Sequence, residues 1–309
     1  MRMHTWSFRG KFIFTKLLIA VGVVWFLSSV ISVYALDVVT EETAQLDTQP
    51  QVLPEVSVII DSRDLTVEQS IASIEALRAL YKNQIEVYRS SEQQYRIAKT
   101  QYFSLQTLAA LEEAVSTTRE ALLNRSRVLV SFVQLLRATL QETQGVELSQ
   151  KQQAMDRLES VLQKLLAHQD AVLDTQTREA VALRAQEFAI LEKELHSTTY
   201  WSLSLISLGR VQTIYDQALI VHADIRETHE SETVSALIEA ERTRAHEETE
   251  RNFIVIRDQL AEIALDIQNK SIKPDSFTDN AFNRTRDDLE VPYAGLTLLI
   301  DYLEELLSL

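Results

Sequence analysis

Residues 74–105 read IEALRALYKNQIEVYRSSEQQYRIAKTQYFSL, and this stretch decides the fold of the chain. It contains neither proline nor glycine, and its tyrosines recur every seven residues, at Tyr81, Tyr88, Tyr95 and Tyr102. A seven-residue repeat of large side chains is typical of one face of a long α-helix that packs against a partner helix. The stretch therefore predicts a long helix with one packing seam.

The same absence of helix breakers extends far beyond this stretch. No proline occurs between Pro54 and Pro274, and the region between them holds only two glycines, Gly145 and Gly209. Proline breaks helices because it lacks a backbone donor and clashes with the preceding turn. We therefore predict an all-α fold, as an elongated antiparallel helical bundle or coiled-coil hairpin of three to five long helices.

Changes in composition divide the chain into four parts. These are a signal or anchor segment at 1–36, an acidic linker with two prolines at 37–64, the long-helix coiled-coil body at 65–273, and a connector with a C-terminal amphipathic helix at 274–309. We expect the last helix to begin at Pro292, after a polar connector over 275–288, and to dock on the body, because proline is favoured at the first position of a helix.

Breaks within the body separate its helices. Apolar spacing from residue 67 to about residue 142 predicts one continuous first helix. Gly145 can take the left-handed conformation that ends a helix. Further breaks are predicted near Asp174 and between Thr228 and Thr233, where polar side chains can cap a new helix.

The amino terminus is typical of an export or membrane-anchoring signal. Four basic residues with no acid precede an uncharged apolar run over 17–36. The run fits a signal peptide cleaved after Ala35. It also fits a retained transmembrane helix, since it would be roughly 30 Å long. Both alternatives put the body on the extracytoplasmic side of the cell envelope, because flanking positive charges stay in the cytoplasm. The chain is then tethered to the membrane if uncleaved, and secreted or periplasmic if cleaved.

Charge and cysteine content exclude several classes of function. The formal net charge is −15, and no basic patch follows the amino-terminal segment. Nucleic-acid binding needs basic side chains that neutralise phosphates, so we expect no nucleic-acid partner. The chain has no cysteine, which excludes disulfides, thiolate zinc sites and cysteine nucleophiles.

Motifs of the common catalytic and metal centres are absent from the sequence. The five glycines are too scattered for a phosphate-binding loop or a nucleophile elbow, and no histidine lies in a Glu-x-x-His or His-Glu-x-x-His pattern. A site made from His222, His229, Glu230 and Glu232 is conceivable at a helix break, but solvated polar residues are the simpler interpretation. We therefore predict no enzyme activity, no cofactor and no metal site.

Two groups of aromatic residues are the candidate contacts with a ligand or partner. The tyrosine face at Tyr81, Tyr88, Tyr95 and Tyr102 forms either a ligand-stacking ladder or a seam between helices, and the seam is favoured. The uncharged segment Thr199–Gly209, with Tyr200 and Trp201, either packs inside the body or contacts lipid or a partner, and packing is favoured.

Two functions fit these observations. The first is a structural or interaction protein of the envelope, which meets other envelope proteins or copies of itself through helical seams. The alternative is a sensory-type ligand-binding bundle, with its site along the tyrosine face or at Tyr200–Gly209. A closed seam favours the first function, and an apolar cavity of several hundred cubic ångströms between the helices would favour the second.

Overall fold

The structure is a computed structural model that describes residues 67–272 and 277–309. Every regular element in these residues is an α-helix: α2 (Val67–Leu105), α3 (Leu108–Glu142), α4 (Leu148–Leu173), α5 (Arg178–Ser231), α6 (Ala236–Ser271) and α7 (Asp279–Ser308). The prediction of an all-helical fold is confirmed. The predicted signal or anchor segment at 1–36 and the linker at 37–64 lie outside the described residues.

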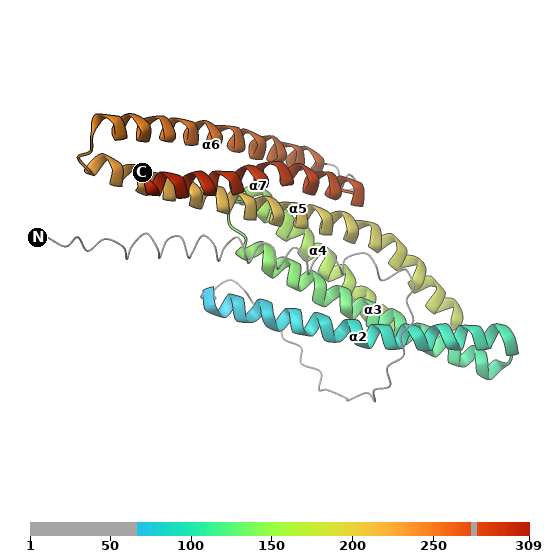
Figure 1. Cartoon of the computed structure of the whole chain (residues 1–309). Coiled ribbons are helices and arrows are strands. Elements are labelled where there is room, and N and C mark those ends of the chain that lie inside the picture. Colours follow the sequence, from blue (N-terminus) through green and yellow to red (C-terminus); the bar gives the residue numbers. More distant parts are fainter. Residues whose placement is uncertain (1–66, 273–276) are drawn as a thin grey trace, which may run out of the picture.

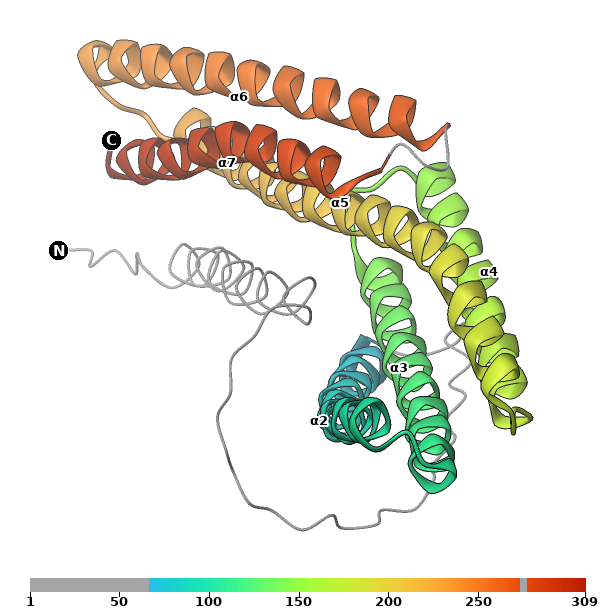
Figure 2. The same ribbon diagram turned by 90° about the vertical axis from the view of Figure 1, so that its right-hand side faces the viewer.

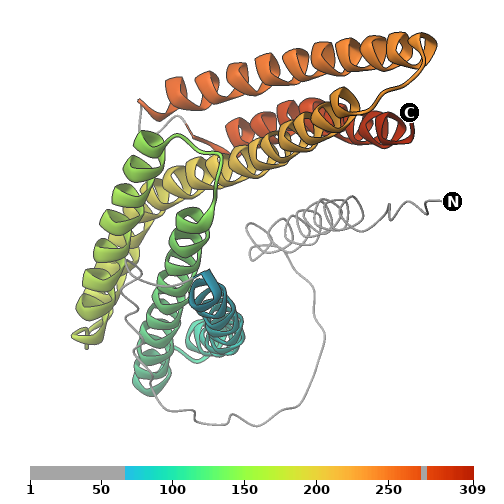
Figure 3. The ribbon, with the colours of Figure 1, turned by 90° about the vertical axis from the view of Figure 1, so that its left-hand side faces the viewer.

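The central element is α5, a helix of 54 residues. Its first half packs with α3 and α4, and its second half packs with α6 and α7 (Figure 1). Figures 2 and 3 show α5 curving from one set of helices into the other. We call α3, α4 and the first half of α5 the first helix group, and α6, α7 and the second half of α5 the second helix group. Helix α2 lies outside both groups and packs mainly on α3.

The predicted first helix is divided in two, so the described residues form six helices rather than three to five. Helix α2 ends where Gln106 takes a positive φ of 48°, and Thr107 then caps α3 by accepting a hydrogen bond from the amide of Ala110. A positive φ stops a helix because the chain leaves the right-handed region. The prediction of one continuous helix over 67–142 is therefore wrong.

Three further helix starts follow the same capping chemistry, whereas Glu147 at the start of α4 makes no side-chain cap hydrogen bond. A threonine or serine at the N-cap accepts a hydrogen bond from the backbone amide three residues later, which satisfies one of the free donors of the first turn. The residues that do this are Thr177 for α5, Ser235 for α6 and Thr278 for α7. The predicted breaks near Asp174 and Thr228–Thr233 are confirmed, since α4 ends at Leu173 and α5 ends at Ser231.

The turn between α3 and α4 lies directly on α5. Gly145 has a φ of +73°, as predicted for the residue that ends this helix, and a Cβ added to it would come within 2.6 Å of the Gly209 carbonyl oxygen. A Cβ added to Gly209 would come within 2.5 Å of the Gln144 carbonyl oxygen. The two glycines therefore allow backbone to approach backbone, which fixes the α3–α4 turn against the middle of α5.

The middle of α5 is enclosed on all sides. Every residue from Ser197 to Ile206 is buried, so this part of the helix has no solvent face. A helix that is buried all round is surrounded by other elements and not exposed along one stripe. The uncharged composition of Thr199–Gly209 is explained by this position, where the two helix groups meet.

The C-terminal helix begins earlier than predicted. Helix α7 starts at Asp279, and Pro292 lies inside it and is buried. The prediction that Pro292 opens this helix, after a connector at 275–288, is wrong for the described residues. The missing amide of Pro292 leaves the carbonyl of Asp288 without its usual helical donor. Asp288 is exposed, so water can serve this carbonyl.

The helices of the described residues are amphipathic or polar over much of their length. Within 67–272 and 277–309, no helix contains a window long and apolar enough to cross a lipid bilayer.

Candidate functional site

The four tyrosines of the predicted face lie along α2 and are all half-buried. Tyr81 packs on Phe132 of α3, with ring centroids 5.5 Å apart. Burial raises the pKa of the Tyr81 and Tyr88 phenols. Successive rings are about 10 Å apart along the helix axis. The structure therefore does not bring the side chains of Tyr81, Tyr88, Tyr95 and Tyr102 together at one point.

Tyr200 and Trp201 lie inside the protein where the two helix groups meet. The Tyr200 ring stacks on Phe282 at 5.6 Å, and the Trp201 ring has the Arg157 guanidinium at 4.5 Å from its centroid. Trp201 is 0% exposed, and its Nε1 has no hydrogen-bond partner among the described residues. Both aromatic residues act as packing groups between helices here, because neither offers a surface to solvent.

The Tyr200 phenol should stay protonated well above the pH at which exposed tyrosines ionise. Burial raises its pKa to about 12, and the charge and hydrogen bond of Asp279 add to this rise. The pKa in the unfolded chain is about 10, so this group stabilises the fold below pH 10 and loses that contribution as the pH rises toward 12. Ultraviolet titration of the native protein should show a phenol that ionises only near pH 12, and this step should be missing from the titration of Tyr200→Phe. Superimposable curves would contradict the assignment.

A cleft of about 480 Å³ lies between the start of α3 and the turn from α4 to α5. Its walls are Leu111, Val115 and Arg119 from α3, and Gln176 and Glu179 beside the turn, among other residues. Arg119 donates a hydrogen bond to the Thr175 carbonyl at 3.3 Å. The cleft lies away from the Thr199–Gly209 segment and was not predicted from the sequence. Four of its nine lining residues are charged, namely Glu112, Arg119, Arg178 and Glu179, so it is not the apolar cavity that would favour the ligand-binding alternative.

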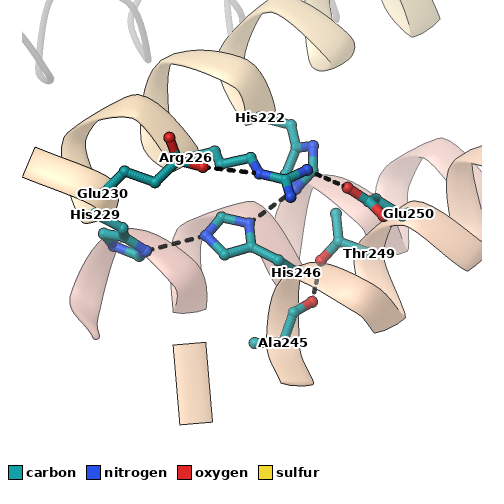
Figure 4. A network of polar contacts seen from close by, with 8 residues as sticks. All are labelled: His222, Arg226, His229, Glu230, Ala245, His246, Thr249 and Glu250. Carbon is teal, nitrogen blue, oxygen red and sulfur yellow. Dashed lines mark hydrogen bonds and ion pairs between the residues drawn. The ribbon is translucent and has the colours of Figure 1, made fainter. Parts of the chain in front are cut away.

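Three histidines form a polar cluster between α5 and α6 (Figure 4). His222 and His229 lie two turns apart on α5, and His246 of α6 lies between their rings. His222 Nε2 is 3.0 Å from His246 Nδ1, and His229 Nδ1 is 3.1 Å from His246 Nε2. Both nitrogens of the central ring are therefore engaged with another imidazole. We call these three residues the histidine cluster.

Ion pairs surround the histidine cluster. Arg226 bonds to Glu230 at 3.3 Å and to Glu250 at 2.5 Å, which links α5 to α6 (Figure 4). Arg242 bonds to Glu232 at 2.8 Å and to the carbonyl of Leu309 at 3.0 Å. The two glutamates considered with His222 and His229 in the sequence thus each pair with an arginine.

Burial lowers the pKa of all three histidines, because removal from water penalises the charged ring. The charge of a neighbouring histidine lowers the pKa of His222 further, and the Arg242 guanidinium does the same for His229. For His246 the nearby Arg226 guanidinium adds to the effect of burial. The cluster is therefore held neutral to lower pH than exposed histidines.

The geometry does not suit a metal ion. His246 presents one nitrogen to each neighbour, so an ion held between His246 and one outer ring cannot also reach the other outer ring. The four residues His222, His229, Glu230 and Glu232 are not assembled around a common point. Among the described residues, no group of three or more histidine, aspartate or glutamate side chains is arranged to hold a metal.

Sequence analysis identified only part of this cluster. The seven-residue spacing of His222 and His229 was a usable signal, because it places both rings on one face of a helix. His246 was missed as their partner, since a sequence does not show which turn of α6 packs opposite them. Comparison of the chain with protein-family models, with curated proteins and with solved structures found no match.

Proposed function

We propose that this chain is a helical structural and interaction protein without catalytic chemistry. The observation that supports this most directly is the filled interior of the Thr199–Gly209 segment, where a ligand site was the alternative. Tyr200 and Trp201 pack against Phe282 and Arg157 there, so side chains occupy the space that a ligand would need. The basic residues that precede the apolar run over 17–36 further favour an exported or membrane-tethered protein on the extracytoplasmic side.

We further propose that the body is an elongated antiparallel bundle in which α2 and α3 form a coiled-coil hairpin. The extensive packing of α2 on α3 supports this arrangement. Leu77, Ile85 and Ala98 are buried on α2, and the half-buried Tyr81, Tyr88 and Tyr95 lie between them along the helix. This alternation of aliphatic and aromatic side chains is typical of a seam between two helices, in which the tyrosine hydroxyls reach solvent at the edge of the seam.

The end of this hairpin is the surface that best fits contact with a partner. Residues 100–111 carry no charge, and three large apolar side chains at the turn are mostly exposed: Phe103 by 65%, Leu105 by 64% and Leu108 by 71%. Clustered apolar side chains on a surface are typical of interaction sites. Figure 1 shows this turn far from α6 and α7, so these two helices do not cover it.

Site-specific crosslinking in the producing cells tests this function. A photoreactive amino acid at Phe103 or Leu108 should give a discrete crosslinked product with a second macromolecule, which mass spectrometry identifies. The matched control is Ile190, which is 75% exposed on α5 but lies outside the hairpin. Crosslinking at Phe103 and not at Ile190 supports the interaction role.

The opposite result favours the ligand-binding alternative. In that case neither hairpin position gives a crosslinked product, and a small envelope molecule raises the melting temperature and quenches tyrosine or Trp201 fluorescence. Binding at the tyrosine face or at Tyr200–Gly209 would open packed side chains, so Tyr81→Ala and Trp201→Phe should then change the affinity. An interaction protein shows no such dependence.

A further inference from the structure

The first half of α6 fully buries no apolar side chain, and only the partly buried Ala245 packs there against the apolar core. Only Arg242, His246 and Thr249 are buried before Phe253, and all three are polar. The second half buries Phe253, Ile256, Leu260, Ile263 and Ile267. Since buried apolar surface is the main source of packing energy, the second half is held firmly and the first half depends on its polar contacts.

Hydrogen-bond geometry limits how many protons the histidine cluster can hold. A neutral imidazole has one N–H donor and one bare nitrogen acceptor. Two arrangements of the protons therefore satisfy both hydrogen bonds of a neutral His246. In the first, all three rings carry their proton on Nε2; in the second, all three carry it on Nδ1. The backbone of Leu306 on α7 also bonds to His229 and favours its protonated form. This favours the first arrangement, in which the free Nε2–H of His229 is the donor to α7.

One additional proton fits this geometry. A cationic His246 donates from both nitrogens, and each outer ring accepts if its proton moves to the far nitrogen. A second proton does not fit. If His246 and one outer ring are both cationic, an N–H of one ring faces an N–H of the other and no hydrogen bond can form. If His222 and His229 are both cationic, each needs an acceptor nitrogen on His246, but a neutral His246 has only one. At least one of the two bonds at 3.0 Å and 3.1 Å must then break.

The charges that face the cluster also match a single proton. Arg226 and Glu230 face it from α5, with Glu232 just beyond that helix, and Arg242 and Glu250 face it from α6. The backbone of Leu306 on α7 also takes part, as does the main-chain oxygen of Leu309 just after α7, through Arg242. The charged side chains carry one more negative than positive charge, so they partly offset the charge of one cationic imidazole. A second cation in this partly buried site is repelled by the first.

We infer that the histidine cluster is an acid-released latch, which holds the first half of α6 on α5 at neutral pH and frees it when a second proton binds. The opening is local, because Phe253 and the apolar residues after it keep the second half of α6 in place. The latch does not depend on the proposed function, since it follows from the contacts of α5, α6 and α7 alone.

The pH window follows from the lowered pKa values of the three rings. An unfolded or freed histidine has a pKa of about 6.5, so the latch is at full strength above this pH. As the pH falls below it, the open state takes up protons that the closed state resists, until the lower pKa values of the closed state are reached. Each extra proton bound on opening raises the ratio of open to closed molecules about tenfold per pH unit.

His168 provides a natural comparison in the first helix group. It is also buried, but its two nitrogens face the Ser126 hydroxyl at 3.2 Å and the Arg184 carbonyl at 3.0 Å. Both of these oxygens can accept, so a doubly protonated His168 keeps both hydrogen bonds. Protonation at this position does not force its helices apart.

Distance measurements on the full chain test the latch. The chain has no cysteine, so pairs of cysteines can carry spin labels without background. One pair replaces Ile220 on α5 and Glu241 in the first half of α6, and the reference pair replaces Ile220 and Leu265 in the second half; all three residues are exposed. Between about pH 7.5 and about pH 5 the first distance should lengthen and broaden, and the reference distance should not change.

Two variants separate the latch from a general effect of acid. The double variant with His222→Gln and His246→Gln leaves His229 as the only ring of the cluster. This ring can be protonated without an imidazolium N–H facing it, so the acid response of the 220–241 distance should disappear. His168→Gln is the matched control and should keep the full response. An unchanged response in the double variant, or no response of the native pair at about pH 5, overturns the proposal.

A third measurement needs no variant, in case the double substitution loosens α6 at neutral pH. Nitrogen NMR of the histidine rings should show protonation of the cluster at the same pH at which the 220–241 distance changes. Two cationic rings in a protein whose α6 is still closed would refute the latch. Binding of one Zn²⁺ ion at neutral pH, with new ligand shifts on all three rings, would replace it with a metal centre.

Discussion

Gly209→Ala should destabilise the protein by about 3 kcal/mol, at the upper end of the usual cost of overpacking. The new methyl group would lie 2.5 Å from the Gln144 carbonyl oxygen and 2.6 Å from side-chain carbons of Thr143 and Val146. Neither the turn nor α5 can move alone, because α5 is enclosed at this point. Chemical denaturation should show a lower midpoint with an unchanged slope.

Gly295→Ala is the matched control for this substitution. Gly295 lies inside α7, and its added Cβ would come no closer than 3.2 Å to Ile256. Alanine is the better helix former by about 1 kcal/mol, so this variant should be neutral or slightly more stable. If both variants lose the same stability, the close approach of the α3–α4 turn to α5 is not the cause.

A double-mutant cycle tests whether Gly209 and Gly145 share one contact. Gly145→Ala should also destabilise, both through its positive φ of 73° and through the approach of its Cβ to the Gly209 carbonyl. Once one methyl group has pushed the turn away from α5, the second has more room. The combined loss should therefore be smaller than the sum of the single losses, and strict additivity would contradict a shared contact.

Trp201→Ala should cost about 3–5 kcal/mol, which is the usual loss when a large buried aromatic side chain is truncated. Trp201 is fully buried, and its removal leaves a cavity beside Phe277 and takes away the ring that faces the Arg157 guanidinium. Thermal and chemical unfolding monitored by circular dichroism measure this loss. The effect should spread to both helix groups, because this residue lies where they meet.

Trp201→Phe is the matched control, since it keeps an aromatic ring but removes the indole N–H. The Nε1 atom of Trp201 has no hydrogen-bond partner within 67–272 and 277–309, so its removal takes away a buried donor that these residues leave unsatisfied. The loss should be clearly smaller than for alanine. Equal losses of stability in Trp201→Ala and Trp201→Phe would mean that the cavity is not the main cause of the destabilisation. They would also mean that the indole N–H has a partner such as a bound water.

The helix breaks show why local sequence predicts some features and misses others. Gly145 and the polar groups near Asp174 and Thr228 are local signals, and the structure ends helices at each of them. The break at Gln106 lacks glycine and proline, so the composition of this region did not predict the end of a helix there. The change of apolar register between Tyr102 and Leu108, with Thr107 as a cap, was the available signal.

Pro292 shows the opposite error. Proline favours the first turn of a helix, and on this ground it was assigned to the start of the last helix. The real start is set by Thr278, whose side chain caps α7, and by packing of the helix on α5 and α6. Tertiary packing offsets the cost of a proline inside a helix, and that energy is not visible in the local sequence.

The sequence by itself determined that this chain is helical, because the lack of proline and glycine and the seven-residue spacing act within single helices. Only the tertiary structure decided that α5 is shared by two helix groups, that Gly145 meets Gly209, and that His246 lies between His222 and His229. The physical reason is that periodicity shows which face of a helix is buried but not which partner buries it. That choice depends on the angle and offset at which helices cross, and side chains far apart in the chain set both.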